Sequence, residues 1–143
     1  MSTLKLERDY AADPKTVFAF VTKAENIVKW WGPEGMSVKD EQLDLTKPGS
    51  WTSTLVNAEG GRYKVSGQVT AIEVPNWVEF TWAWHDENDA RGHESKVRFD
   101  VKANGRGGTL FLLTHTGLAD DESAKNHEQG WGSALNKLER MAN

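Results

Sequence analysis

Cysteine is absent from the 143 residues of this sequence. Disulfide bonds and cysteine-ligated metal sites are therefore excluded, and a cytoplasmic location is expected. No stretch approaches the ~20 apolar residues that a membrane-spanning helix requires. Residues 1–9 are charged and lack the apolar segment of a signal peptide. We therefore predict a soluble protein with no membrane partner.

Clusters of basic residues are also lacking. The 17 Lys and Arg residues are scattered among 21 Asp and Glu residues, giving a formal net charge of −4. Nucleic-acid binding needs basic residues gathered on one face, so no nucleic-acid partner is expected. Without repeats or linkers, residues 1–143 are predicted to form a single domain, long enough for a core without crosslinks.

Motifs of the common catalytic and metal sites are missing. The four histidines, at positions 85, 93, 115 and 127, do not have the H-E-x-x-H or H-x₃₋₅-H spacing of a zinc site. There is no G-x-S-x-G motif, and the glycines of 105–108 are typical of a turn between two strands. We therefore expect no metal ion and no cofactor.

Tryptophan, in contrast, is abundant, with seven residues. Each buried aromatic ring can remove ~150–250 Å² from water, and aromatic rings commonly line ligand pockets. The tryptophans therefore belong either to the core or to the walls of a pocket.

A long amphipathic helix is predicted at the C-terminus, with Asp120 as its N-cap. Gly130 and Gly132 flank Trp131 in its middle, and each should cost about 0.8–1 kcal/mol relative to alanine. We expect close packing to explain these glycines; the alternative is a weak point that lets the helix shift over a cavity. One apolar face of this helix comprises Ala124, His127, Trp131, Leu135, Leu138 and Ala142.

The rest of the chain is predicted to form mostly strands. A first strand covers residues 3–10, a helix capped by Asp13 starts at Pro14, and a second short helix spans 24–31 until Gly32 and Pro33 stop it. Alternation of apolar residues then predicts strands at 36–45, 51–55, 63–74, 78–85, 97–102 and 109–116. Consecutive hairpins imply an α+β protein with an antiparallel sheet of six to seven strands, and the long helix is the element against which its apolar face can pack.

Alternation and helical phase also predict which side chains face the space between sheet and helix. These candidate ligand-binding residues are Trp51, Tyr63, Phe80, Trp82, Trp84, Phe99, Phe111, Leu113, His115, His127 and Trp131. Leu110 and Leu112 fall on the outer face, either as scattered surface leucines, which we favour, or as a patch for a homodimer.

An ordered set of motifs resembles one known family over nearly the whole chain. They are Trp30-Trp31-Gly32-Pro33, Pro48-Gly49, Gly67-Gln68-Val69, Phe80-Thr81-Trp82-Ala83-Trp84, His115-Thr116-Gly117-Leu118, Gly130-Trp131 and the Leu135/Leu138 repeat. The chain resembles the stand-alone bacterial members of the activator of heat-shock protein 90 ATPase homologue family. That family belongs to the START-like, or SRPBCC, superfamily. The resemblance implies a helix-grip fold, in which a curved antiparallel sheet wraps around the long C-terminal helix and an apolar cavity lies between them. It implies no single function.

Three functions are compatible with these observations. We favour a binding module for a small apolar or amphiphilic molecule. An enzyme of the cyclase, isomerase or hydrolase type would use His115 or His127 as general acid or base; we weigh a structural role for both histidines above this. A co-chaperone-like interaction is the third function, and a single domain leaves no room for a second chaperone-binding domain, which argues against a chaperone partner.

Overall fold

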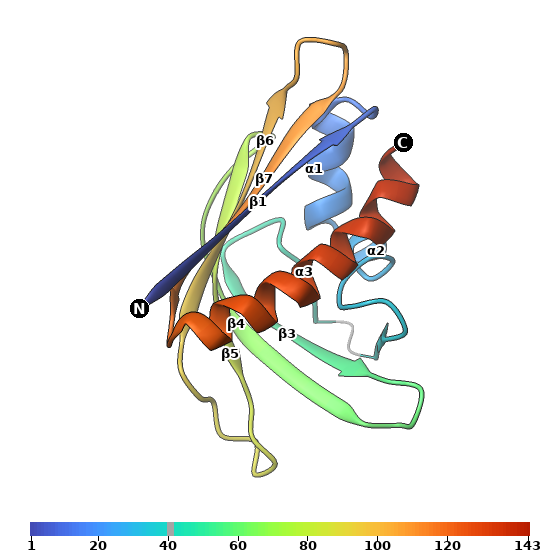
Figure 1. The fold of residues 1–143 in the computed structure, drawn as a ribbon. Helices are drawn as coiled ribbons and strands as arrows, with labels where there is room; N and C mark the ends of the chain where they lie inside the picture. Colours follow the sequence, from blue (N-terminus) through green and yellow to red (C-terminus); the bar gives the residue numbers. More distant parts are fainter. Residues whose placement is uncertain (40–41) are drawn as a thin grey trace.

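The computed structural model describes residues 1–39 and 42–143, in which seven strands and three helices form an α+β fold (Figure 1). In chain order the elements are β1 (Ser2–Tyr10), α1 (Pro14–Thr22), α2 (Ala24–Ile27), β2 (Ser37–Val38), β3 (Gly49–Val56), β4 (Arg62–Glu73), β5 (Trp77–Trp84), β6 (Ser95–Ala103), β7 (Thr109–Leu118) and α3 (Asp121–Ala142).

All of these strands belong to one antiparallel sheet with the order β1-β7-β6-β5-β4-β3-β2. Hairpins join β3 through β7, whereas β1 comes from the start of the chain and pairs with β7 at the end of the order. The sheet curls around one side of α3, and α1 and α2 lie beyond the C-terminal half of α3 (Figure 1). The predicted fold class is confirmed.

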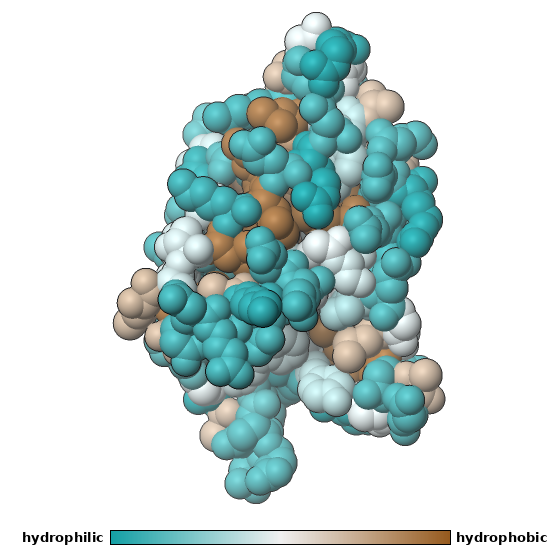
Figure 2. Space-filling view, in the orientation of Figure 1, coloured by the Kyte–Doolittle hydropathy of each residue, from teal (hydrophilic) through white to brown (hydrophobic). Residues whose placement is uncertain are grey.

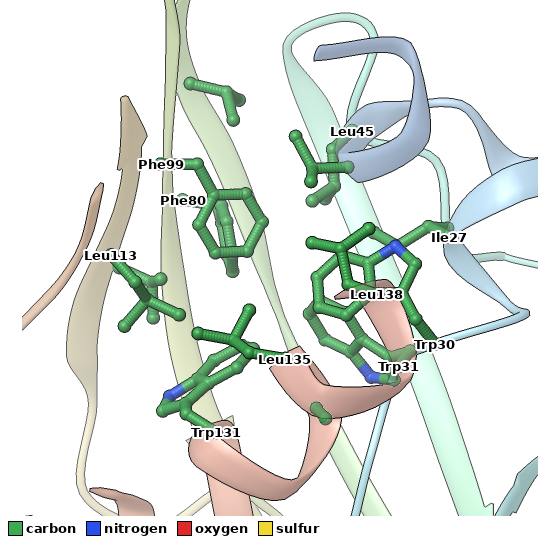
Figure 3. Close-up of a cluster of buried hydrophobic side chains, with 14 of the residues drawn as sticks. Ile27, Trp30, Trp31, Leu45, Phe80, Phe99, Leu113, Trp131, Leu135 and Leu138 are labelled. Atoms are coloured by element: carbon green, nitrogen blue, oxygen red, sulfur yellow. The ribbon is translucent and has the colours of Figure 1, made fainter. Parts of the chain in front are cut away.

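The inward face of the sheet follows from alternation along its strands. In β6, Val97, Phe99 and Val101 are buried, and Phe99 pairs with Val78 on β5 and Leu113 on β7. Because paired residues point to the same face, their side chains form continuous apolar rows. Figure 3 shows these rows meeting side chains of α3 and of the α2 region.

The long helix α3 is set by its cap and its apolar face. Asp120 accepts a hydrogen bond from the backbone N–H of Ser123 at 2.8 Å, as an N-cap residue does. The C-terminal end of α3 is tied to the residues after β1, since the Ala12 N–H donates to the Ala142 carbonyl at 2.8 Å. The buried face comprises Trp131, Ala134, Leu135, Leu138 and Ala142.

Close packing does not explain the two glycines of α3, and that prediction is wrong. A Cβ atom at Gly130 would meet nothing nearer than Pro33 Cγ at 3.9 Å, and one at Gly132 nothing nearer than Arg8 Nη2 at 3.8 Å. Both are ordinary van der Waals distances. The weak point over the cavity therefore stays as the alternative prediction.

Two predicted elements are too long. The strand expected over residues 36–45 is only Ser37–Val38; residues 40 and 41 lie outside the described part of the chain, and residues 42–45 have no strand structure. The apolar residues Leu43 and Leu45 are spaced as in a strand because both side chains are buried in the core. The backbone is not part of the sheet there, since the Leu45 N–H donates to the Thr22 carbonyl at 3.0 Å.

The second helix ends at Ile27 instead of reaching Trp31. Turns follow it, and both tryptophans there are fully buried. The indole N–H of Trp30 donates to the Phe20 carbonyl at 2.8 Å, which fixes that ring against α1. Tertiary contacts of the two rings, and not helix propensity, therefore decide the backbone here.

On the face in Figure 2, most residues are hydrophilic and the hydrophobic ones appear in separate areas. Leu110 and Leu112 on β7 are half-buried and lie opposite charged residues, for example Asp9 and Glu7 on β1. The homodimer stays a prediction. In residues 1–39 and 42–143, no helix is both long and apolar enough to cross a membrane.

Candidate ligand-binding cavity

A cavity of ≈ 250 Å³ lies between the inner face of the sheet and the N-terminal half of α3. Its third wall is the segment of residues 31–36 between α2 and β2. The lining residues are Trp31, Gly32, Pro33, Met36, Leu55, Tyr63, Trp82, Trp84, Asn126, His127, Gly130, Trp131 and Ala134.

Strand pairing and helical spacing bring these residues together. Leu55 on β3 and Tyr63 on β4 are direct cross-strand partners, and alternation in β5 places Trp82 and Trp84 on the same face. In α3, residues 127, 130, 131 and 134 follow the i, i+3, i+4, i+7 spacing of one helix face. The sheet therefore bounds the cavity on one side, and α3 bounds it on the other.

Segment 31–36 is fastened to α3. Glu34 N–H donates to Ser133 Oγ at 2.8 Å, and Lys137 Nζ donates to the carbonyls of Trp31 and Pro33 at 3.4 Å each. Burial lowers the pKa of Lys137, and the nearby Glu34 carboxylate partly opposes that shift.

Glycine is required within this segment, at Gly32. Its φ is positive, in the left-handed region that side chains disfavour. A Cβ there would also lie 2.6 Å from Leu55 Cδ2, which is closer than such atoms can approach. Any other residue at position 32 would strain the backbone and force the Leu55 side chain of β3 to move.

Three tryptophans from three different segments form the aromatic side of the cavity. The ring centroids of Trp31 and Trp131 are 5.5 Å apart, those of Trp31 and Trp82 are 5.7 Å apart, and those of Trp82 and Trp131 are 5.1 Å apart. Such edge and tilted contacts are favourable arrangements of aromatic pairs. The indole N–H groups of Trp31 and Trp82 are buried and have no hydrogen-bond partner in the part of the chain that the structure describes.

His115 is fully buried, and both of its ring nitrogens are occupied. Trp131 Nε1–H donates to His115 Nδ1 at 3.1 Å, so the proton of the neutral ring is on Nε2, which faces Ser95 Oγ at 2.7 Å. The Ser95 hydroxyl donates its own proton to the Trp82 carbonyl at 3.3 Å. Burial lowers the pKa of His115 to about 3, and nearby His127 acts in the same direction. This ring is therefore neutral at physiological pH.

His127 has a similar arrangement. Its Nε2 accepts the indole N–H of Trp84 at 3.1 Å, and its Nδ1 donates to the Ser123 carbonyl, one turn earlier, at 2.7 Å. The ring centroids of His115 and His127 lie 5.0 Å apart. The structure therefore brings the two candidate histidines together, but hydrogen bonds already occupy their four ring nitrogens. This arrangement supports the structural interpretation over general acid–base chemistry.

The candidate ligand-binding residues divide into two groups. Tyr63, Trp82, Trp84, His127 and Trp131 line the cavity. The others are packed in the core and are not among the residues that line it: Trp51, Phe80, Phe99, Phe111, Leu113 and His115.

Sequence reasoning missed several lining residues, above all Trp31, Met36 and Leu55. Leu55 had a usable signal, because it lies on the same buried face of β3 as Trp51. Trp31 follows another tryptophan at a predicted helix end, so no periodicity marked it. Among residues 1–39 and 42–143, no three histidine, aspartate or glutamate side chains converge as a metal site.

A curved antiparallel sheet that grips a long C-terminal helix, with a cavity between the two, defines the START-like class of proteins. The family model described as "Activator of Hsp90 ATPase homolog 1-like protein" matches residues 11–143. The chain belongs to this family, as its sequence motifs predicted.

Solved structures agree with this assignment. An AHSA1 protein from Silicibacter pomeroyi is 47% identical, with a TM-score of 0.93 over 98% of this chain and 96% of that one. At 19% identity, a protein from Chromobacterium violaceum shares the fold alone, with a TM-score of 0.86 over 98% of this chain and 96% of that one. A search of the curated proteins gives no match.

Proposed function

We propose that this protein binds a small apolar or amphiphilic molecule in the cavity between the sheet and α3. The observation that carries the proposal is a cavity of ≈ 250 Å³ walled by Trp31, Trp82, Trp84 and Trp131. A concave apolar site with a few polar groups is the usual form of a small-molecule site. The START-like fold, which generally holds ligands at this place, supports the same conclusion.

The volume limits the size of the ligand. A cavity of about 150 Å³ holds a benzene molecule. The ≈ 250 Å³ here therefore suits a compound of one or two rings or a short acyl chain. Sterols and long-chain lipids are larger than this volume and would require α3 to move away from the sheet.

A thermal-unfolding screen of small aromatic acids, ketones and short-chain fatty acids tests this proposal. A ligand at ~100 times its Kd should stabilise the fold by about 2.7 kcal/mol. In a domain of this size the unfolding midpoint should then rise by roughly 5–10 °C. If no compound shifts the midpoint, and none changes the tryptophan fluorescence, the proposal fails.

Two leucine substitutions in α3 locate the bound compound. Gly130→Leu adds a side chain to the cavity lining, where a Cβ has room, and should weaken binding at least ~10-fold by filling the site. Gly132→Leu makes the same change two residues away, outside the lining, and removes the same helix penalty. Equal affinities for the two variants would place the ligand elsewhere.

The remaining hypotheses have less support. An enzyme acting through His115 or His127 would need a free ring nitrogen, and the hydrogen bonds of both rings use theirs. No surface feature of the described residues favours the chaperone interaction. These functions, the homodimer and the cytoplasmic location stay sequence-based predictions.

A further inference from the structure

A second group of reactive side chains lies on the opposite face of the sheet from the cavity. Ser66 follows the inward-facing Val65 on β4, and His85 follows Trp84 at the end of β5, so both point outward. His85 Nε2 lies 2.6 Å from Ser66 Oγ. On its other side, His85 Nδ1 lies 2.9 Å from Asp89 Oδ1. The three side chains form one continuous hydrogen-bonded line from hydroxyl to imidazole to carboxylate.

The neighbouring atoms determine where the protons are. His85 Nδ1 faces the Asp89 carboxylate and, at 3.1 Å, the Asp89 carbonyl, and both of these groups can only accept. The neutral ring therefore carries its proton on Nδ1 and presents the lone pair of Nε2 to Ser66. Arg91 Nε donates to Ser66 Oγ at 2.9 Å, which leaves the hydroxyl proton for His85. This is the tautomer that a general base requires.

The same chain contains a serine–histidine pair with the reverse polarity. His115 Nε2 lies 2.7 Å from Ser95 Oγ, but the Trp131 N–H occupies Nδ1, so the imidazole donates its proton to Ser95. Among the described residues, no carboxylate is bonded to His115. Both pairs therefore have a short serine–histidine distance. Only in the Ser66–His85 pair does the imidazole present a lone pair to the serine hydroxyl.

Asp89 is held in an uncommon backbone conformation. Its φ is positive, in the left-handed region. That region costs a non-glycine residue on the order of 1 kcal/mol. Lys64 Nζ donates to its carboxylate at 3.1 Å, and the hydrogen bonds from Lys64 and His85 lower the pKa of Asp89. An ionised carboxylate is thus placed against His85 Nδ1 in a strained conformation, which is typical of functional sites.

A cleft lies beside His85 and Asp89. Its lining also includes Lys64 and Arg62, and it shares Tyr63 and Trp84 with the lining of the first cavity. Ser66 is not among these lining residues and is buried, at 7% exposed, so the substrate considered for it is limited to a small acyl group. The Arg91 guanidinium lies at the same place, where its Nη2 donates to the Ser66 carbonyl at 3.0 Å and its Nη1 pairs with the Glu94 carboxylate at 3.0 Å.

We propose that Ser66, His85 and Asp89 form a second site, independent of the cavity, that hydrolyses small carboxylic esters. Ser66 Oγ attacks the ester carbonyl carbon and passes its proton to His85 Nε2, while Arg91 stabilises the oxyanion. The C–O bond to the alcohol then breaks, and the leaving alkoxide takes the proton from His85. Water, deprotonated by His85, next attacks the acyl-Ser66 ester, which releases the acid and restores the hydroxyl. Asp89 acts as a positioning residue that holds the imidazole in its basic tautomer.

A fluorophosphonate probe tests the nucleophile directly. Attack by an activated serine forms an O–P bond and releases fluoride, so the intact mass increases by one phosphonyl group. We expect one adduct, which peptide mapping assigns to Ser66, and hydrolysis of p-nitrophenyl acetate that the probe blocks. Absence of an adduct, or an adduct at another residue, overturns the proposal without any variant.

Variants separate chemistry from folding. Ser66→Ala should abolish both labelling and hydrolysis, whereas Ser50→Ala, which removes an exposed hydroxyl bonded to Gln68 on β4, should change neither. Asp89→Asn tolerates the left-handed backbone, and should slow labelling at least ~100-fold with an unchanged unfolding midpoint. Labelling of Asp89→Asn at the wild-type rate, or persistence of hydrolysis in Ser66→Ala, would overturn the site.

Discussion

Acid should destabilise this fold through one histidine, His115. Burial lowers its pKa from 6.5 to about 3 in the folded protein. The unfolded chain keeps the ordinary value, so the unfolded state binds the proton more readily than the folded state does. The resulting stability is fully present above the ordinary pKa and is lost progressively as the pH falls toward that of the folded state.

The magnitude follows from the difference between the two pKa values. Each pH unit below the ordinary pKa costs about 1.4 kcal/mol until the folded-state pKa is reached. Over two pH units, at pH 4.5, the loss is therefore about 3 kcal/mol. Protonation would also oblige Nδ1 to lose the hydrogen bond that it accepts from Trp131. A loss of this size is a substantial part of the roughly 5–15 kcal/mol typical of a small domain.

Urea unfolding followed by tryptophan fluorescence, between pH 7.5 and 4.5, measures this loss. The control is His115→Gln, whose amide can accept from Trp131 and donate to Ser95 but does not titrate. Subtracting the two free-energy curves removes the contributions of all other groups, and the difference should change by about 3 kcal/mol over this range. A difference that stays constant with pH would refute the reasoning.

The glycines provide two opposite predictions. Gly67→Ala should destabilise the fold by more than ~3 kcal/mol. The reason is that its Cβ would overlap the Thr81 carbonyl oxygen on the neighbouring strand. Gly132→Ala should instead raise the free energy of unfolding by about 0.8–1 kcal/mol, because its Cβ meets only ordinary contacts in α3. Urea unfolding measures both; a neutral Gly67→Ala, or a destabilising Gly132→Ala, would contradict the respective argument.

Periodicity was sufficient for the architecture because it reports which face of an element is buried. The alternation along β6 and the helical spacing of Trp131, Leu135 and Leu138 predicted elements that the structure confirms. The ordered motifs predicted the family, which the match to residues 11–143 confirms. At Leu43 and Leu45 the same spacing arises from two buried side chains outside any strand, so the prediction of a strand failed there.

Periodicity could not predict which of the inward-facing side chains line the cavity and which are packed in the core. Phe80 and Trp82 share one face of β5, yet of the two only Trp82 lines the cavity, while the rings of Trp51 and Phe99 pack against Phe80. Alternation reports a face and carries no information on which other side chains cover it.

The position of the proton on His115 likewise depends on a partner from another element, Trp131 on α3. The sequence alone determined the family, the order of elements and the inward-facing residues, since these depend on local pattern. Only the tertiary structure decided which side chains enclose the cavity and which imidazole nitrogen carries a lone pair, because both depend on contacts between distant segments.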